Sequence, residues 1–187
     1  LRYGTVQIVV TEYKLDEIAV TGNKWFSEQE IMSEVELKPG MALSLTGIRD
    51  DVRRLNQNPF RTINAVFSPG TAQGYTDVTL QTTDRLPIRA YGTYDTYGIP
   101  IMGRQEWALG GSWGNVAGLG HIAGYQFTHS VADLYSSHAI SYSIPLPWHD
   151  SLEVFGTYAW EHTKSSLNGE PLNEMGHSGQ ASIRYVH

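Results

Sequence analysis

The sequence contains no cysteine, which excludes disulfide bonds and cysteine-based zinc or redox sites. Charged residues make up 17% of the 187 residues, against about 25% in typical soluble domains. The formal net charge of −6 argues against a nucleic-acid-binding surface. No apolar run reaches the roughly 18–20 residues of a transmembrane helix. The chain also starts at Leu1 without a signal peptide, so we expect it to be a piece of a longer protein.

The composition changes part-way along the chain. Residues 86–187 contain 14 of the 21 aromatic residues, 13 of the 19 glycines and all seven histidines, but only 12 of the 32 charged residues. The change falls at Asp84-Arg85-Leu86-Pro87, where the proline favours extended backbone in the residue before it. We therefore expect separate domains at 12–85 and 86–187, each suited to different surroundings.

The first part has the pattern of a small α+β domain. Residue types and alternation predict strands at 5–11, 15–21, 61–67 and 75–83. Gly22-Asn23 predicts a turn after the second of these strands. Two amphipathic helices are expected between 22 and 61, where they can cover one face of the sheet. The predicted order from residue 15 is strand, helix, helix, strand, strand.

The first helix has a clear start. Ser27 and Glu30 have the spacing of a capping box, in which each side chain bonds the other residue's free backbone N–H. Phe26 and Ile31 have the spacing of a hydrophobic staple, and Ile31 and Val35 predict a buried stripe. We expect this helix to end at Pro39-Gly40.

The second helix is predicted at 45–57 and ends at Asn58-Pro59. Its apolar residues share one face, and they are Leu45, Ile48, Val52 and Leu55. Asp50 and Arg54 have the spacing of an ion pair on the solvent side. For Arg53 and Arg54 the simplest interpretation is a solvated helix face.

This order resembles a polypeptide-transport-associated (POTRA) domain. The residues that carry the resemblance are Gly22-Asn23, the segment Leu55-Asn56-Gln57-Asn58-Pro59-Phe60, and Pro69-Gly70. The resemblance implies that residues 1–11 contain the last strand of a preceding POTRA domain.

From residue 86 onward the apolar pattern has a period of two. Six strands are predicted, centred near 91, 109, 125, 141, 156 and 183. One face is apolar with aromatic ends, and the other is rich in Gly, Ala, Ser and Thr, which fits an outer-membrane β-barrel. A soluble β-sandwich is the alternative. Because six strands do not close a membrane barrel, we expect a partial barrel that aggregates or needs detergent.

The two parts together are similar to the transporters of two-partner secretion, the haemolysin secretion/activation family. The carrying segments are Leu55–Arg61, Pro69-Gly70, Gly74–Val78, Asp84–Pro87, Tyr91–Gly98, Trp113–Asn115 and Gly118–Gly120. Members often have Asp-Asn where this chain has Asp95-Thr96. The family's plug helix and its later-strand loop have no counterpart in the sequence.

The resemblance implies transport in the bacterial outer membrane, with the POTRA domain in the periplasm. The POTRA domain would capture an unfolded, secreted exoprotein and the barrel pore would export it, without a nucleotide. A barrel-assembly factor or insertase is the alternative, and a soluble or surface β-rich binding module is a third hypothesis. The expected partners are the exoprotein and outer-membrane lipid, with no nucleic acid.

The resemblance also implies a client-binding strand at the sheet edge. An edge strand offers unpaired backbone groups to which an extended client can add as a further strand. The predicted binding residues are Thr62, Ile63, Asn64, Ala65, Val66 and Phe67, with Arg53 and Arg54 as anion contacts. A purely structural strand is the alternative for these residues.

No catalytic, cofactor or metal site is predicted, so we do not expect an enzyme. Glu174 and His177 have the spacing of a carboxylate metal site, but Gly176 and Gly179 oppose the helix that such a site needs. The glycines at 118–124 lack the spacing and the following helix of a dinucleotide-binding loop.

Overall fold

The computed structural model describes residues 12–148, 150–167 and 170–186. The strand expected at 5–11 and the turn expected at Asn168-Gly169 lie outside these residues. The chain divides into two compact units, one ending at Asp84 and the other beginning at Arg85. None of the described helices combines the length and hydropathy needed to cross a bilayer.

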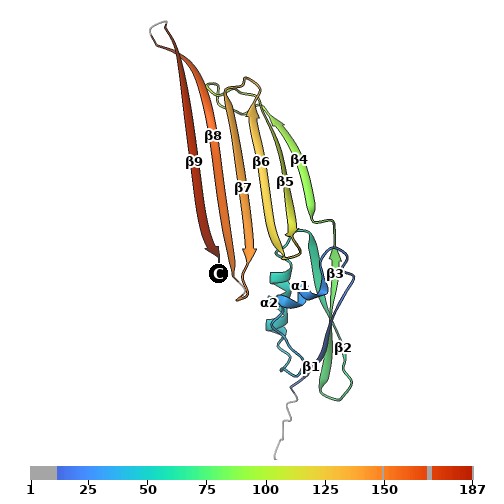
Figure 1. Ribbon diagram of the computed structural model, residues 1–187. Helices are drawn as coiled ribbons and strands as arrows, with labels where there is room; N and C mark the ends of the chain where they lie inside the picture. Colours follow the sequence, from blue (N-terminus) through green and yellow to red (C-terminus); the bar gives the residue numbers. More distant parts are fainter. Residues whose placement is uncertain (1–11, 149, 168–169, 187) are drawn as a thin grey trace, which may run out of the picture. The chain divides into compact units, whose positions relative to one another are not determined.

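The first unit has the predicted element order. Its elements are β1 (Lys14–Thr21), α1 (Glu28–Ser33), α2 (Leu45–Leu55), β2 (Arg61–Pro69) and β3 (Tyr75–Asp84). The strands form one sheet in the order β1-β3-β2 (Figure 1). β3 pairs parallel to β1 and antiparallel to β2, so β2 lies at an edge.

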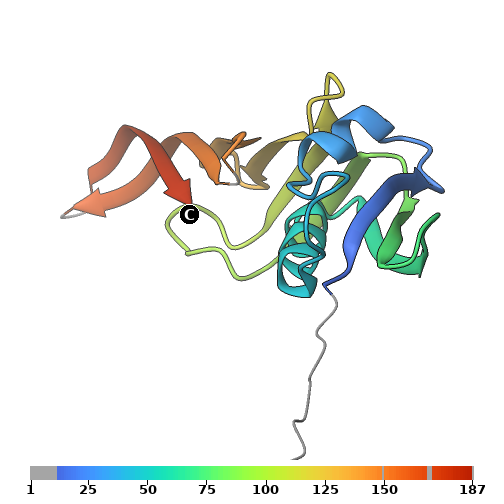
Figure 2. The same cartoon turned by 90° about the horizontal axis from the view of Figure 1, so that it is seen from below.

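One hydrophobic core holds this unit together. It takes Ile31 from α1, Leu55 from α2 and residues from all three strands, among them Leu15, Ile63 and Leu80. These five side chains are almost fully buried. Both helices lie on the same side of the sheet (Figure 2), so the amphipathic faces predicted from the sequence meet in this core.

Helix α1 begins as predicted but ends earlier than predicted. The Ser27 hydroxyl accepts a hydrogen bond from the Glu30 N–H at 3.1 Å, which confirms that half of the capping box. The helix ends at Ser33, well before Pro39-Gly40. At Glu34 the backbone C=O accepts a bond from Arg54 at 3.4 Å, and the carboxylate binds Arg61. Other elements thus bind both the backbone C=O and the side chain of the residue at which the helix ends.

Helix α2 corrects two predictions. Ile48 and Leu55 are buried, but Leu45 is 65% exposed, because the first turn of the helix lies beyond the core. Asp50 pairs with Arg53, not with the predicted Arg54, and the atoms are 2.6 Å apart. The side chain of Arg54 turns instead toward Asp51.

Two aspartates tie loops to the strands. The Asp84 carboxylate accepts hydrogen bonds from the N–H groups of residues 24, 25 and 26 at 2.8, 2.7 and 3.1 Å. Asp16 accepts bonds from the N–H and the hydroxyl of Thr71, both at 2.7 Å. These two bonds, the hydroxyl's first, hold the pKa of the Asp16 carboxyl below its usual value. Both ends of the sheet are therefore fixed by charge-assisted bonds.

The predicted turn at Gly22 requires glycine. Its φ is +82°, a conformation that other residues rarely adopt. A Cβ at this position would lie 2.4 Å from the carbonyl oxygen of Thr82. The close approach lets the chain leave β1 directly beside β3.

The second unit is a six-stranded antiparallel sheet in chain order (Figure 1). Its strands are β4 (Ile88–Asp95), β5 (Glu106–Val116), β6 (His121–Ser130), β7 (Tyr135–Pro145), β8 (Ser151–Leu167) and β9 (Glu170–Val186). The number of strands agrees with the prediction. The last two, at 17 residues each, are longer than the expected 9–11 or so, and their pairing is continuous from Ser151 to Leu167.

Candidate functional site

The predicted binding residues Thr62–Phe67 all lie in β2 at the edge of the three-stranded sheet. Their side chains alternate as expected. Ile63 is buried and Ala65 packs against the core, whereas Thr62, Asn64 and Val66 are exposed on the other face. Phe67 lies on the core side but is 43% exposed. The structure therefore brings all six residues together on one edge strand.

The backbone of β2 alternates between its neighbour and the open edge. In an antiparallel pair, residues that bond across the ladder alternate with residues whose N–H and C=O groups point outward. The Ile63 N–H donates to a side chain at 2.7 Å, which places Ile63 in the outward set. Ala65 and Phe67 follow at intervals of two, opposite Leu80 and Val78 in the same register. Their backbone groups face the side on which no other described strand lies.

Asn56 covers the first of these outward positions. Its Oδ1 accepts from the Ile63 N–H at 2.7 Å, and its Nδ2 donates to the Ile63 C=O at 2.9 Å. Nearby, the Arg61 N–H donates to the C=O of Asn58 at 3.3 Å. The start of the β2 edge is thus closed by the segment that follows α2.

The two arginines of α2 are placed differently. The Arg53 side chain is 73% exposed and pairs with Asp50. The Arg54 side chain is 18% exposed, and its Nη2 binds Asp51 and lies 3.6 Å from Oε1 of Glu36. Burial raises the pKa of the Asp51 carboxyl, against the opposing effect of the Arg54 guanidinium. The solvated helix face expected for both residues therefore describes Arg53 and not Arg54.

An open, mainly apolar hollow of about 480 Å³ adjoins the free end of β2. Phe67 lines it together with Leu45 from the start of α2 and Tyr13 from the start of the sheet. More than 40% of the surface of each of these three side chains is exposed. Glu12 is the charged residue in its described lining. Most of its lining comes from the β1 and β3 side of Phe67, so the hollow does not extend to the open edge of β2.

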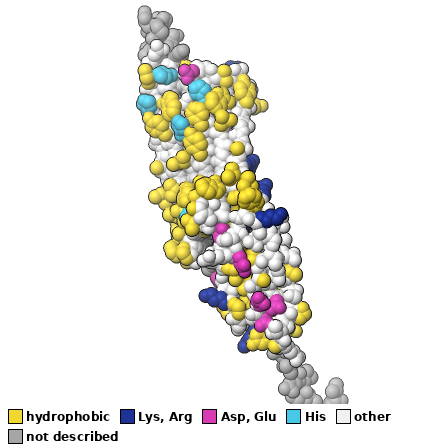
Figure 3. Space-filling view, turned by 45° about the vertical axis from the view of Figure 1, so that its right-hand side comes forward, with side chains coloured by type: hydrophobic (Ala, Val, Ile, Leu, Met, Phe, Trp, Pro, Cys, Tyr) yellow, Lys and Arg dark blue, Asp and Glu magenta, His cyan; other side chains and the backbone are white. Residues whose placement is uncertain are grey.

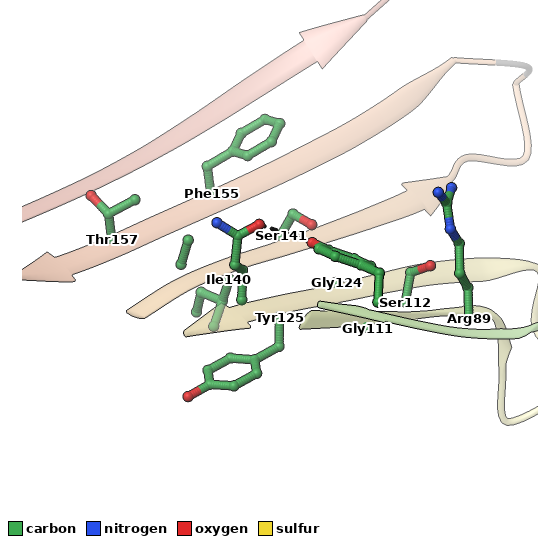
Figure 4. A pocket seen from close by; sticks show the side chains of 12 residues that line it. Arg89, Gly111, Ser112, Gly124, Tyr125, Ile140, Ser141, Phe155 and Thr157 are labelled. Carbon is green, nitrogen blue, oxygen red and sulfur yellow. Dashed lines mark hydrogen bonds between the residues drawn. The ribbon is translucent and has the colours of Figure 1, made fainter. Parts of the chain in front are cut away.

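The second unit has one polar face. A row of paired residues crosses all six strands on this face, in the order Arg89, Ser112, Gly124, Ser141, Phe155 and Ser182. Part of the row lines a hollow of about 390 Å³. Figure 4 shows Arg89, Ser112 and Ser141 on one side of the strands, while Tyr125 points to the other side. This face suits contact with water.

Tyr91 packs across the neighbouring strand on the polar face. Its hydroxyl donates to Oε1 of Gln126 on β6 at 3.0 Å, across Gly110 of β5. A Cβ at Gly110 would lie 2.5 Å from the ζ carbon of the Tyr91 ring. Glycine at this position therefore makes room for the aromatic ring.

The opposite face is apolar, with aromatic and histidine side chains toward one end. A second row crosses the strands there, in the order Tyr94, Trp107, His129, Ser136, Trp160 and His177. Figure 3 shows histidines among the hydrophobic side chains that gather over the strands. Leu109, Ile140 and Ile183 on this face are each more than half exposed. Apolar exposure on this scale marks a surface that meets lipid or another protein.

The metal site set aside from the sequence has no geometric basis. Glu174 and His177 lie on β9, and their odd spacing places them on opposite faces of the strand. Among the residues that the structure describes, no group of three or more His, Cys, Asp or Glu side chains could hold a metal ion.

Comparison with known families identifies the first unit. The POTRA family model, described as a surface antigen variable number repeat, matches residues 13–85. Residues 13–85 form a POTRA domain. In this POTRA domain β2 is one of the two edge strands, and the helices cover the face that carries Ile63.

Solved structures match both units. CdiB from Escherichia coli aligns with a TM-score of 0.79 at 17% identity, and CdiB from Acinetobacter baumannii with 0.71 at 19%. BamA from Haemophilus ducreyi lacking POTRA domains 1–3 aligns with 0.60 at 15%. The alignments cover 91–92% of this chain and 32–33% of those chains, so the chain spans about a third of their length. No curated protein matches the sequence.

These matches confirm the predicted fold, an α+β POTRA domain followed by the antiparallel strands of a partial β-barrel. The two CdiB matches show a likeness of fold. Sequence reasoning missed the role of Asn56. Its position directly after a helix was the available signal, because Asn side chains there often bond nearby backbone groups.

Proposed function

We propose that the chain is part of an outer-membrane transporter of the two-partner secretion kind. The POTRA domain captures an unfolded exoprotein in the periplasm, and β4–β9 contribute to the barrel through which it leaves. The POTRA match, the fold likeness to CdiB and the sequence resemblance support this proposal.

The observation that carries the capture step is the open edge of β2. The outward N–H and C=O groups of Ala65 and Phe67 can pair with any extended chain, because backbone groups are common to all sequences. Such pairing suits a client that is unfolded and long. The partly exposed ring of Phe67 adds an apolar side-chain contact at this edge.

The two faces of β4–β9 support a place in the outer membrane. The apolar face with its aromatic and histidine row would meet lipid, and the polar face with Arg89 and Tyr91 would line the pore. The bacterial outer membrane is the proposed location, with lipid as a second partner.

The anion contact proposed for α2 falls to Arg53. Its guanidinium is largely exposed, whereas that of Arg54 is occupied by Asp51 and the Glu34 carbonyl group. Of the two arginines, Arg53 is the one whose guanidinium an acidic client residue can meet at the surface. We keep this contact as a minor contribution, since exposed ion pairs contribute about 0–1 kcal/mol.

A barrel-assembly factor is the second candidate, favoured by the fold likeness to BamA. Such a protein would insert other barrels into the membrane instead of exporting one soluble client. The same β2 edge serves both functions, so the client must be identified by experiment.

The test uses the full-length parent protein, expressed in a Gram-negative host with the large exoprotein encoded beside it. Ala65→Pro and Phe67→Pro each remove one outward N–H from an edge strand, a position where proline is tolerated. Val66→Thr is the control, because its backbone faces β3 and its side chain is exposed on the outer face.

We expect both proline variants to reduce exoprotein in the medium, and the control to export normally. Deletion of residues 12–84 should abolish export. If export continues without these residues, capture by the POTRA domain is wrong. If the exoprotein is unaffected while other outer-membrane barrels assemble poorly, the assembly function replaces the transport function.

A further inference from the structure

The edge of β2 is only partly available to a client. Of its outward-facing residues, Ile63 is bonded through both backbone groups to the Asn56 side chain, at 2.7 and 2.9 Å. A primary amide that accepts from an N–H and donates to a C=O reproduces the pair of bonds that a neighbouring strand would make. Asn56 therefore occupies the place of a strand at this position.

The opposite end of the edge is limited by proline. Pro69 is the last residue of β2 and follows Phe67 in the outward set. Proline has no N–H, so it cannot donate to an added strand. Between Ile63 and Pro69, Ala65 and Phe67 are left with both an N–H and a C=O group toward the open side.

The side chains beside this opening favour an apolar ligand residue. A client residue that pairs with Phe67 places its side chain on the same face as Phe67. The Phe67 ring is 43% exposed on that face. An apolar client side chain at this place packs against the Phe67 ring, as apolar and aromatic residues do in cross-strand pairs.

We propose that Asn56 is an edge cap that sets the register and length of the bound client strand, an inference that rests on the proposed function. The client pairs at Ala65 and Phe67 and not at Ile63, and it carries an apolar residue opposite Phe67. Because only Ala65 and Phe67 pair with the client, one POTRA domain can hold a long chain weakly enough for it to move on toward the pore.

The first test is amide hydrogen exchange at single-residue resolution on the full-length parent in detergent. The probe is the exoprotein encoded beside it, unfolded in urea and diluted into the sample. In the unsubstituted protein we expect the probe to slow exchange about fivefold or more at Ala65 and Phe67. The Ile63 amide is already protected by Asn56 and should not change.

Asn56→Ala should open the cap. Without the probe, the Ile63 amide should exchange faster, and with the probe it should become protected together with Ala65 and Phe67. Exchange at the Leu80 amide of the central strand shows whether the domain remains folded. If the probe still protects only the Ala65 and Phe67 amides in Asn56→Ala, the edge-cap proposal is wrong and the capture function stands. Absence of any protection in β2, in either protein, would instead contradict the capture function.

A second measurement covers the case in which Asn56→Ala does not fold. Asn56→Asp keeps the acceptor for the Ile63 N–H but loses the donor to its C=O group. A photo-crosslinking residue at Thr62 or at Val66, both exposed on the outer face, then reports where the probe lies. We expect crosslinks from Val66 in both proteins, and from Thr62 in Asn56→Asp alone. Equal crosslinking from Thr62 with Asn56 in place would overturn the proposal.

Discussion

The Nη2 atom of Arg61 lies 2.7 Å from each carboxylate oxygen of Glu34. The Arg61 side chain is only 2% exposed, and its Nε donates to the C=O of Leu55 at 2.8 Å. Its guanidinium also lies over the Phe26 ring, 5.1 Å from the centroid. One side chain thus joins the end of α1, the end of α2 and the start of β2.

Replacement of Arg61 should destabilise the POTRA domain strongly. Arg61→Met keeps much of the apolar volume but leaves the carboxylate of Glu34 and the C=O of Leu55 without this donor. Removal of one partner of a buried ion pair costs about 3–5 kcal/mol of unfolding free energy. Urea dependence of amide exchange at Leu80 measures this loss in the full chain. Arg53→Met, on the exposed face, should change the free energy by less than about 1 kcal/mol, and equal effects of the two would contradict this account.

The carboxylate of Asp84 should be a second point of sensitivity. Asp84→Asn leaves one carbonyl oxygen and loses the charge that three N–H groups now share. We expect a loss of about 2 kcal/mol, as for hydrogen bonds to charged groups. The same exchange measurement applies. Asp77→Asn is the matched control, because Asp77 accepts one exposed bond, from the Glu17 N–H at 3.2 Å; the prediction fails if Asp77→Asn is the more damaging change.

The bond between Asp16 and Thr71 predicts a pH dependence. The folded-state pKa of Asp16 is lowered by the Thr71 hydroxyl first and by its N–H second. The bonds therefore stabilise the fold above the unfolded-state pKa of about 3.9, and this contribution is lost as pH falls through the folded-state pKa. Exchange of the Thr71 amide should be faster in Asp16→Ala than in the unsubstituted chain at pH 7. After correction for intrinsic exchange, the two proteins should converge at low pH. Thr71→Val removes the hydroxyl donor and should weaken the pH dependence, whereas an undiminished dependence would assign it to another group.

Gly110 and Tyr91 should behave as a coupled pair. Gly110→Ala places a methyl group against the Tyr91 ring and should break the bond to Gln126. Over-packing of this kind costs about 1–3 kcal/mol. Tyr91→Ala combined with Gly110→Ala should recover part of that loss, because the clash is absent. Thermal melting of the full-length parent in detergent, followed by circular dichroism, measures the coupling. Gly179→Ala serves as the control, because a Cβ there would lie 3.7 Å from the Tyr158 ring, an ordinary contact distance. Gly118→Ala is unsuitable, because the φ of +73° at Gly118 would strain any residue with a side chain.

Local signals in the sequence predicted much of the fold. The Ser27 cap, the alternation of Ile63 and Ala65 with exposed neighbours, and the period of two after residue 86 act over a few residues. Each depends on backbone geometry that the residue itself favours. For this reason the element order and the six later strands agree with the structure, whereas the edge position of β2 followed from the resemblance to POTRA domains.

The errors arise where distant residues decide the outcome. Glu34, where α1 ends, binds Arg61, 27 residues further along the chain, and no local pattern reports that contact. Asn56 reaches Ile63 only because α2 ends where β2 begins to pair with β3. The length of β8 and β9 was also underestimated, because polar residues continue a strand as readily as apolar ones when a partner strand lies beside them.

The 17-residue strands β8 and β9 have a consequence for the cell surface. At about 3.3 Å per residue they extend roughly 56 Å, whereas a tilted strand needs about 9–11 residues to cross the hydrocarbon layer. In the proposed orientation, the outer third of this hairpin stands clear of the lipid as a paired ribbon. In that orientation, the paired residues 162–167 and 170–175 lie outside the lipid, where antibodies, phages and proteases reach them and where a label can be attached on living cells.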